Sequence, residues 1–200
     1  MIDTLSLKEQ FESLLRSTGR KGVENVLTEL NRLGFFNAPA SSSFHLNEPG
    51  GLVLHSLNVC SAARSIYAMA CALNPSRLAN LTENSVIVAA LLHDVCKAEI
   101  YKPTTKRKKL PSGEWVDEPG YTIDYSTLPV GHGEKSVIRL LQMGFELTDE
   151  EIAAIRWHMC AWDLNFNSNE QRSSIGVAGD RYPLLTILQT ADMFSTKILE

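Results

Sequence analysis

The stretch Val86-Ile-Val-Ala-Ala-Leu-Leu92 is apolar from end to end, and the pair His93-Asp94 follows it directly. We expect a helix over residues 83–97, with Thr82 as its N-cap. An imidazole and a carboxylate at the end of an apolar run are unfavourable to bury without partners. Both groups are also good ligands for a divalent transition metal. Taken alone, the pair is explained more simply by a helix that ends at the surface, so its meaning depends on the other histidines.

Helical patterns dominate the chain on both sides of this stretch. Apolar residues recur at helical spacing over residues 7–18, 23–33, 52–73, 132–143, 149–159 and 183–192. Ser6 and Thr148 each stand three residues before a glutamate, which predicts a capping box, and Pro183 suits the first turn of the last helix. Loops are expected over residues 35–50 and over residues 165–180, where Asn, Ser and Gly are frequent.

Residues 100–131 differ in composition from the rest of the chain. Five cations lie between Lys102 and Lys109, and the turn-forming Pro111-Ser112-Gly113 separates them from a β-prone stretch that begins at Trp115. A further turn is expected at Pro119-Gly120. The predicted fold is therefore an all-α helical bundle with one small inserted β-hairpin around residues 100–130. We expect a single domain over residues 1–200, with an N-terminal helical layer over residues 1–36 and a core over residues 50–195.

The totals exclude several classes of protein. The 200 residues are 44% hydrophobic and 21% charged, which is ordinary for a globular domain. A net charge of −4 argues against a protein built mainly to hold nucleic acid, so no stable nucleic-acid complex is expected. No apolar run is long enough to span a bilayer, and the N-terminus does not resemble a signal peptide. The four cysteines are scattered, which indicates buried thiols in a reducing compartment and a cytoplasmic location.

Histidines and aspartates recur on or beside the predicted helices in a way that links them to His93-Asp94. His55 lies on an apolar helical face, where on its own it would be read as a hydrogen-bonded core residue. Several such residues on separate helices are harder to explain individually, because bundle metal sites are built from inward-facing His and carboxylate ligands. The series is His55, His93, Asp94, His132, His158 and Asp192.

This ordered series resembles the HD superfamily of metal-dependent phosphohydrolases. The family pattern is a first His, a His-Asp pair, often two further His, and a distant Asp, all on helices, and the match covers roughly residues 50–195. The segments around His132 (Val-Gly-His-Gly-Glu-Lys-Ser) and His158 (Ala-Ile-Arg-Trp-His-Met) are similar to those of bacterial and phage HD hydrolases. No Gly-Tyr-Pro signature of the cyclic-di-GMP branch is present.

The resemblance implies an HD-domain bundle that binds one or two divalent transition metal ions, among them Fe, Mn, Co, Ni or Zn. One ion would be held by His55, His93, Asp94 and Asp192, and a second by His132 and His158 with Asp94 bridging. The implied activity is phosphomonoester or phosphodiester hydrolysis of a nucleotide or similar small phosphorylated substrate by a metal-activated water. Two alternatives stay open: a di-iron oxygenase of the myo-inositol oxygenase type, and a non-catalytic nucleotide-binding module.

Lysines near the ligand series are candidates for contact with a substrate phosphate. Lys97 lies one turn beyond His93-Asp94, so we assign it a catalytic role beside Asp94 as well as substrate binding. Lys135 is three residues from His132, and Arg64 lies farther along the helix of His55. The Lys102–Lys109 run is either a solvated face or a basic lid over the site. His45 is expected at the surface.

Overall fold

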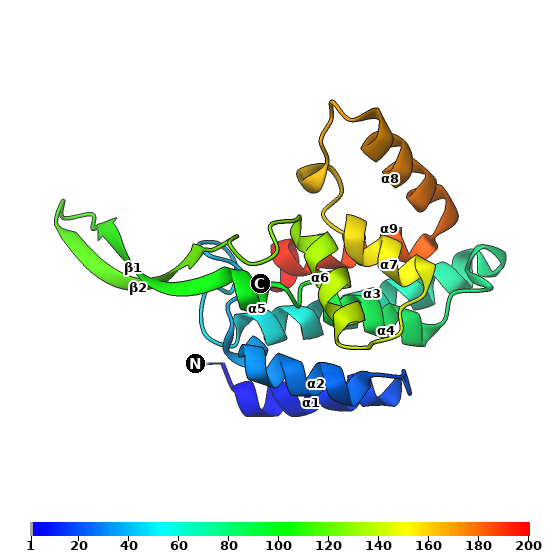
Figure 1. The fold of residues 1–200 in the computed structure, drawn as a ribbon, viewed down its shortest axis with the longest axis horizontal. Coiled ribbons are helices and arrows are strands. Elements are labelled where there is room, and N and C mark those ends of the chain that lie inside the picture. The colour runs from blue at the N-terminus through cyan, green and yellow to red at the C-terminus, as the bar shows by residue number, and fades with distance from the viewer. Residues whose placement is uncertain (1) are drawn as a thin grey trace.

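The computed structural model describes residues 2–200, apart from the side chain of residue 163. These residues form a helical body from which a two-stranded hairpin projects (Figure 1). No helix in the described residues is long and apolar enough to cross a membrane. The helices are α1 (Thr4–Ser17), α2 (Val23–Leu33), α3 (Gly51–Leu73), α4 (Glu83–Leu92), α5 (Lys97–Ile100), α6 (His132–Gln142), α7 (Asp149–Trp157), α8 (Asn169–Arg181) and α9 (Pro183–Phe194), and the strands are β1 (Tyr101–Lys109) and β2 (Trp115–Ile123).

The apolar helix α4 forms the centre of the body. Every residue from Ser85 to Leu92 is buried, and α4 packs against α1, α3, α7 and α9. A helix that is apolar on all sides is stable only when neighbours cover all of it. Full burial of a side chain such as Leu91 or Leu92 contributes about 1.5–3 kcal/mol. The side chain of Thr82 accepts a hydrogen bond from the backbone N–H of Ser85, which confirms the predicted N-cap.

The N-terminal layer shares this core. The rings of Phe11, Phe35 and Phe36 contact one another at centroid distances of 5.2–5.6 Å. Gly34 ends α2 with φ of +76°, a conformation that glycine adopts without strain. Between α1 and α2, the guanidinium of Arg20 forms an ion pair of 2.6 Å with the buried carboxylate of Glu151 on α7. The layer is therefore joined to the body by both apolar packing and a buried ion pair.

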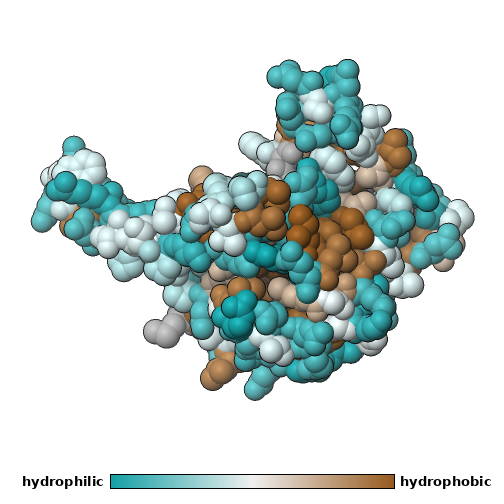
Figure 2. Space-filling view, viewed as in Figure 1, coloured by the Kyte–Doolittle hydropathy of each residue, from teal (hydrophilic) through white to brown (hydrophobic). Residues whose placement is uncertain are grey.

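The inserted hairpin matches the predicted position. β1 and β2 pair antiparallel, with Tyr101 opposite Ile123 and Lys109 opposite Trp115. Gly113 has φ of +91° in the connecting turn, as the Pro-Ser-Gly sequence predicts. The second predicted turn is wrong, because Pro119-Gly120 lies within β2. The hairpin extends away from the helices (Figure 1), and its surface is mostly hydrophilic (Figure 2).

Two predicted helix boundaries differ from the structure, and one helix was predicted as a loop. α1 begins at Thr4, and Asp3 rather than Ser6 caps it by accepting from the Ser6 N–H. The helix predicted over residues 83–97 is two helices, because the chain turns at His93–Cys96 with short i→i+3 bonds such as Lys97 N–H to Asp94 O (2.9 Å). The loop predicted over residues 165–180 contains α8, whose N-cap is Ser168. Only Ala178 of α8 is buried, so no apolar stripe indicated it.

Candidate metal centre

Six side chains from separate parts of the fold meet at one point inside the body. His55 comes from α3, and Asp192 comes from α9. His93-Asp94 and His158 lie at the first turns after α4 and α7, while His132 is the first residue of α6. We call His55, His93, Asp94, His132, His158 and Asp192 the Asp94 cluster.

Asp94 is the centre of this cluster, and its side chain is 1% exposed. One carboxylate oxygen faces His55 and His93, and the other faces His132 and His158. A carboxylate with histidines on both sides is suited to bridge two cations. The distances are 3.6 Å from Oδ2 to His55 Nε2, 3.1 Å from Oδ2 to His93 Nε2, 3.9 Å from Oδ1 to His132 Nε2 and 3.6 Å from Oδ1 to His158 Nε2.

The ring orientations of two histidines suit metal binding. Nδ1 of His93 lies 2.9 Å from the Ala90 carbonyl, and Nδ1 of His158 lies 2.7 Å from the Ile155 carbonyl. Because a carbonyl only accepts hydrogen bonds, Nδ1 carries the proton in both rings and Nε2 presents a lone pair to the cluster. This is the usual orientation of a metal-binding histidine.

Several ligand atoms in the cluster have no hydrogen-bond partner. Nε2 of His55, Nε2 of His93 and Oδ1 of Asp94 are buried and make no hydrogen bond within the described residues; their nearest charged neighbours lie at 3.3 Å, 3.1 Å and 3.6 Å. Leaving a buried polar atom unpaired destabilises the fold by about 1–3 kcal/mol. Two of these atoms, on His55 and His93, face one side of Asp94, and Oδ1 faces the other side, toward His132 and His158, so a cation on either side would satisfy them. The donor set of imidazoles and carboxylates therefore fits a divalent transition metal.

Ligand atoms fall into overlapping groups within 4.8 Å of one another. One group is His55, His93 and Asp94, and another is Asp94, His132 and His158. A third group joins His158 and His93 to Asp192, so His158 also faces the first position. Asp192 Oδ1 lies 3.3 Å from His55 Nε2.

Two members of the cluster already have the protonation state of a metal ligand: Asp94 is an ionised carboxylate, and His132 is a neutral imidazole. Burial would raise the pKa of the Asp94 carboxyl, but Lys97 and the neighbouring histidines hold it well below its usual value. Burial and the nearby His158 lower the pKa of His132 to about 3, so this ring is neutral. For His55, burial lowers the pKa, but the adjacent carboxylates of Asp192, Asp94 and Glu200 outweigh burial and raise the pKa well above its usual value. A cation would displace that proton.

Lys97 lies beside the cluster and lines the adjoining cleft. Its Nζ is 2.6 Å from Asp94 Oδ2, although the residue begins a separate helix instead of continuing α4. The cleft has a volume of about 450 Å³. It is lined by Ala40, Ser41, Phe44, His45, Lys97, Ile100, Tyr101, Tyr125, Gly131, His132 and Met159.

The structure does not bring the other two candidate substrate-binding residues to the cluster. Lys135 is buried, and its Nζ donates to the Thr127 carbonyl and lies 3.5 Å from Glu99. Helical spacing places Lys135 one turn from His132, but its long side chain turns toward these acceptors. Arg64 pairs with Glu83 on the surface at 2.7 Å.

Two residues near the cluster were not among the predicted ligands. Nδ1 of His55 lies 3.0 Å from Oε1 of Glu200, and Nε2 of His45 lies 3.8 Å from Oε2 of Glu200. Glu200 follows the last predicted helix, in a position with no apolar pattern to orient it. His45 lies in a Ser-rich loop and was expected at the surface, but it lines the cleft. Nothing in the sequence spacing links either residue to the series.

The cysteines do not contribute to the cluster. Cys60 and Cys96 are buried, Cys71 is partly buried and Cys160 is exposed, so the prediction of buried thiols is right for only two of them. Burial raises the pKa of the Cys60 and Cys96 thiols to about 12, so neither is a thiolate near neutral pH.

The fold and the cluster define a helical protein with a buried His/Asp group that could hold a metal ion. No family model, curated protein or solved structure matches the chain. The resemblance to HD phosphohydrolases therefore depends on the residues of the cluster alone.

Proposed function

We propose that this protein is a metal-dependent phosphohydrolase that acts on a small phosphorylated substrate such as a nucleotide. One observation carries the proposal: five His and Asp side chains converge around Asp94, and three of the buried ligand atoms make no hydrogen bond within the described residues. An arrangement of this kind destabilises a protein unless a bound cation compensates it. It is therefore more easily explained by metal binding than by a structural role.

The proposed metal positions follow the two groups that share Asp94. His55, His93 and Asp94 would hold one ion together with Asp192, whose Oδ1 lies 3.3 Å from His55 Nε2, and Asp94, His132 and His158 would hold a second. When bound, such ions supply Lewis acidity toward a phosphoryl oxygen and toward water.

The cleft beside the cluster would bind the substrate. Lys97 supplies a cation at the boundary between the Asp94 cluster and the cleft, where it would pair with a phosphate oxygen. Phe44, Tyr101 and Tyr125 line the cleft, and a flat base or other apolar group would pack against such rings. A volume of about 450 Å³ lies in the range of small-molecule sites.

A hydrolysis screen tests the proposal. The protein is loaded with Mn²⁺, Fe²⁺ or Co²⁺ and incubated with nucleotides, cyclic nucleotides and dinucleotides while released phosphate, other products and dissolved O₂ are followed. Metal-dependent hydrolysis supports the proposal. Consumption of O₂ with the Fe²⁺-loaded protein and no hydrolysis would favour the oxygenase, and binding of a nucleotide without turnover would favour a binding module.

A further inference from the structure

We propose that Glu200 positions His55 and makes the metal position at His55 the tighter of the two. The inference rests on the metal centre of the proposed function. It concerns why the position at His55 would bind its metal ion more tightly than the position at His132 and His158. Three observations support it: the partner of His55, the way Glu200 is held, and the unequal charge at the two positions.

His55 differs from His93 and His158 in the group that its Nδ1 faces. His93 and His158 donate to neutral backbone carbonyls. Nδ1 of His55 instead lies 3.0 Å and 3.2 Å from the two carboxylate oxygens of Glu200. A carboxylate that accepts from a ring N–H fixes the ring and makes the opposite nitrogen a stronger ligand.

Glu200 is held in place for this contact. Its side chain is 1% exposed, and Oε1 also accepts a hydrogen bond of 3.2 Å from the side-chain amide of Asn58, one turn after His55 on α3. Burying a carboxylate is unfavourable unless hydrogen bonds and opposite charge compensate it. Both of these partners lie on α3, so Glu200 is anchored to the helix that carries the ligand.

The two metal positions therefore have unequal charge. The position at His55 has the carboxylates of Asp94 and Asp192 among its ligands and the carboxylate of Glu200 behind His55. The position at His132 and His158 has Asp94 as its shared carboxylate and Asp192 within 4.8 Å of His158, but a neutral carbonyl, not a carboxylate, lies behind His158. More negative charge around a divalent cation favours its binding.

Two substitutions separate the charge of Glu200 from its hydrogen bonds. In Glu200→Gln, the amide oxygen takes the place of Oε1 and still accepts from both His55 and Asn58, but the charge is lost. In Glu200→Ala, the charge and both hydrogen bonds are lost. Glu146→Gln is the matched control, because Glu146 is an exposed glutamate whose partner is Lys21 and not a residue of the cluster.

Mn²⁺ titration by calorimetry and by equilibrium dialysis measures the two affinities without using activity. We expect Glu200→Ala to weaken the tighter Kd by roughly 10- to 100-fold and to leave the weaker Kd unchanged. Glu200→Gln should weaken the tighter Kd by a smaller factor, and Glu146→Gln should match the wild type. Thermal unfolding identifies any variant that does not fold, in which case Glu200→Gln carries the test.

Two results would overturn the inference. One is a tighter Kd that is the same in wild type, Glu200→Gln and Glu200→Ala. The other is an equal loss at both positions, which would indicate a general disturbance of the fold. A wild-type protein that binds no Mn²⁺ would instead refute the metal centre itself, so the two failures are distinguishable.

Discussion

Asp94 lies within 4 Å of nitrogen atoms from five side chains, and no other residue of the cluster has as central a position. Four of these atoms are histidine Nε2 and the fifth is Lys97 Nζ. The nearest positive charge to Asp94 is that of Lys97, whose Nζ lies 2.6 Å from Oδ2. A substrate phosphate that enters the cleft would compete with Asp94 for this lysine.

Lys97→Ala tests that role. We expect kcat/KM for a phosphate ester to fall roughly 10- to 100-fold, because hydrogen bonds to charged groups contribute about 1.5–3 kcal/mol. Mn²⁺ binding should be retained, since Lys97 is not a ligand. The control is Lys102→Ala, which removes an exposed lysine on β1. An unchanged kcat/KM in Lys97→Ala would leave Lys97 as a structural partner of Asp94.

Thiol labelling tests the burial of the cysteines. Iodoacetamide at pH 8 should modify exposed Cys160 first, while Cys60 and Cys96 react only after unfolding, because burial raises the pKa of both thiols to about 12. Mass spectrometry of peptides after timed labelling gives the order. Labelling of Cys96 at the rate of Cys160 would contradict the packing around α4.

At the residue scale, the sequence was sufficient to select the six side chains that converge in the structure. His and Asp residues on or beside apolar helical segments are expected to face the interior, and several of them on separate helices indicate a shared site. It was not sufficient for Lys135, where helical spacing describes the Cβ position but not the direction of a long side chain. Glu200 was missed for a different reason. Its contact with His55 joins residues far apart in sequence, and no local pattern encodes such a contact.

Among the secondary-structure elements, α6 and α7 approach so closely that only glycine fits between them. A Cβ on Gly133 would lie 2.5 Å from the Arg156 carbonyl oxygen and 2.8 Å from that of Ile155. This approach brings Nε2 of His132 within 3.2 Å of Nε2 of His158. The second metal position therefore depends on a residue that is not itself a ligand.

Gly133→Ala should separate α6 from α7. We expect a loss of about 1–3 kcal/mol in the free energy of unfolding and weaker Mn²⁺ binding at the His132 position, with binding at His55 retained. Urea unfolding and metal titration measure the two effects. Gly176→Ala in the exposed part of α8 is the control, since nothing lies within 4 Å of its Cβ and alanine favours helix. Wild-type values for Gly133→Ala would refute the steric argument.

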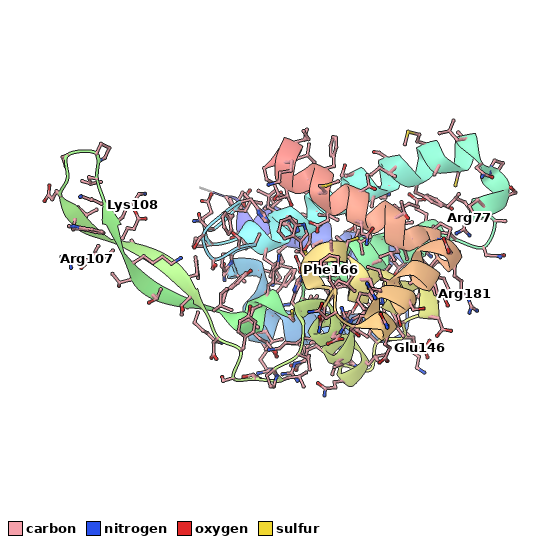
Figure 3. The ribbon with its side chains drawn as sticks, turned by 90° about the horizontal axis from the view of Figure 1, so that it is seen from above. Arg77, Arg107, Lys108, Glu146, Phe166 and Arg181 are labelled. Carbon is pink, nitrogen blue, oxygen red and sulfur yellow. The ribbon has the colours of Figure 1, made fainter. Side chains whose placement is uncertain are left out.

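The position of the hairpin argues against a lid role for its outer cations. Arg107 and Lys108 lie at the far end of the projecting strands (Figure 3). Lys106 instead donates to the Ser42 carbonyl and the Ser43 hydroxyl at 2.6 Å, in the loop that also borders the cleft. This contact attaches the middle of β1 to the body.

Neutralising Arg107, Lys108 and Lys109 together should therefore leave KM and its salt dependence unchanged. Steady-state kinetics at two ionic strengths provides the measurement. A higher KM with a flatter salt dependence would show that the hairpin folds over the site and attracts the substrate.

Helix boundaries were less predictable than helix positions. The N-caps Thr82 and Thr148 and the first-turn position of Pro183 were predicted correctly, because these residues act locally. The end of α4 was not, because the turn at His93–Cys96 contains no glycine or proline that would mark it in the sequence. α8 was missed since an exposed polar helix lacks the apolar period from which helices are recognised.

For the molecule as a whole, the N-terminal layer and the metal-binding body form one structure. Phe11, Leu27 and Phe35 belong to the same buried cluster as the residues of α4 and α9. Arg20 and Glu151 join the two parts by an ion pair in which Glu151 is fully buried. The layer was predicted from its two apolar stripes, but this ion pair, which links residues 131 positions apart, was not.

Arg20→Ala should therefore destabilise the whole fold. We expect a decrease of about 3 kcal/mol in the free energy of unfolding, because the buried carboxylate of Glu151 would lose its partner. The neighbouring substitution Lys21→Ala removes an exposed pair with Glu146 and should change stability by less than about 1 kcal/mol. Urea unfolding of both variants makes the comparison. Equal effects would contradict the account of this contact.

The most direct test of the central claim is the metal content of the wild type and of Asp94→Ala. Both proteins are dialysed against Mn²⁺ and analysed by elemental mass spectrometry, with circular dichroism to establish that the variant is folded. The wild type should retain about two ions per chain, as expected for a shared-carboxylate site, and Asp94→Ala should retain almost none. If Asp94→Ala bound as much Mn²⁺ as the wild type, Asp94 would not be the centre of a metal site.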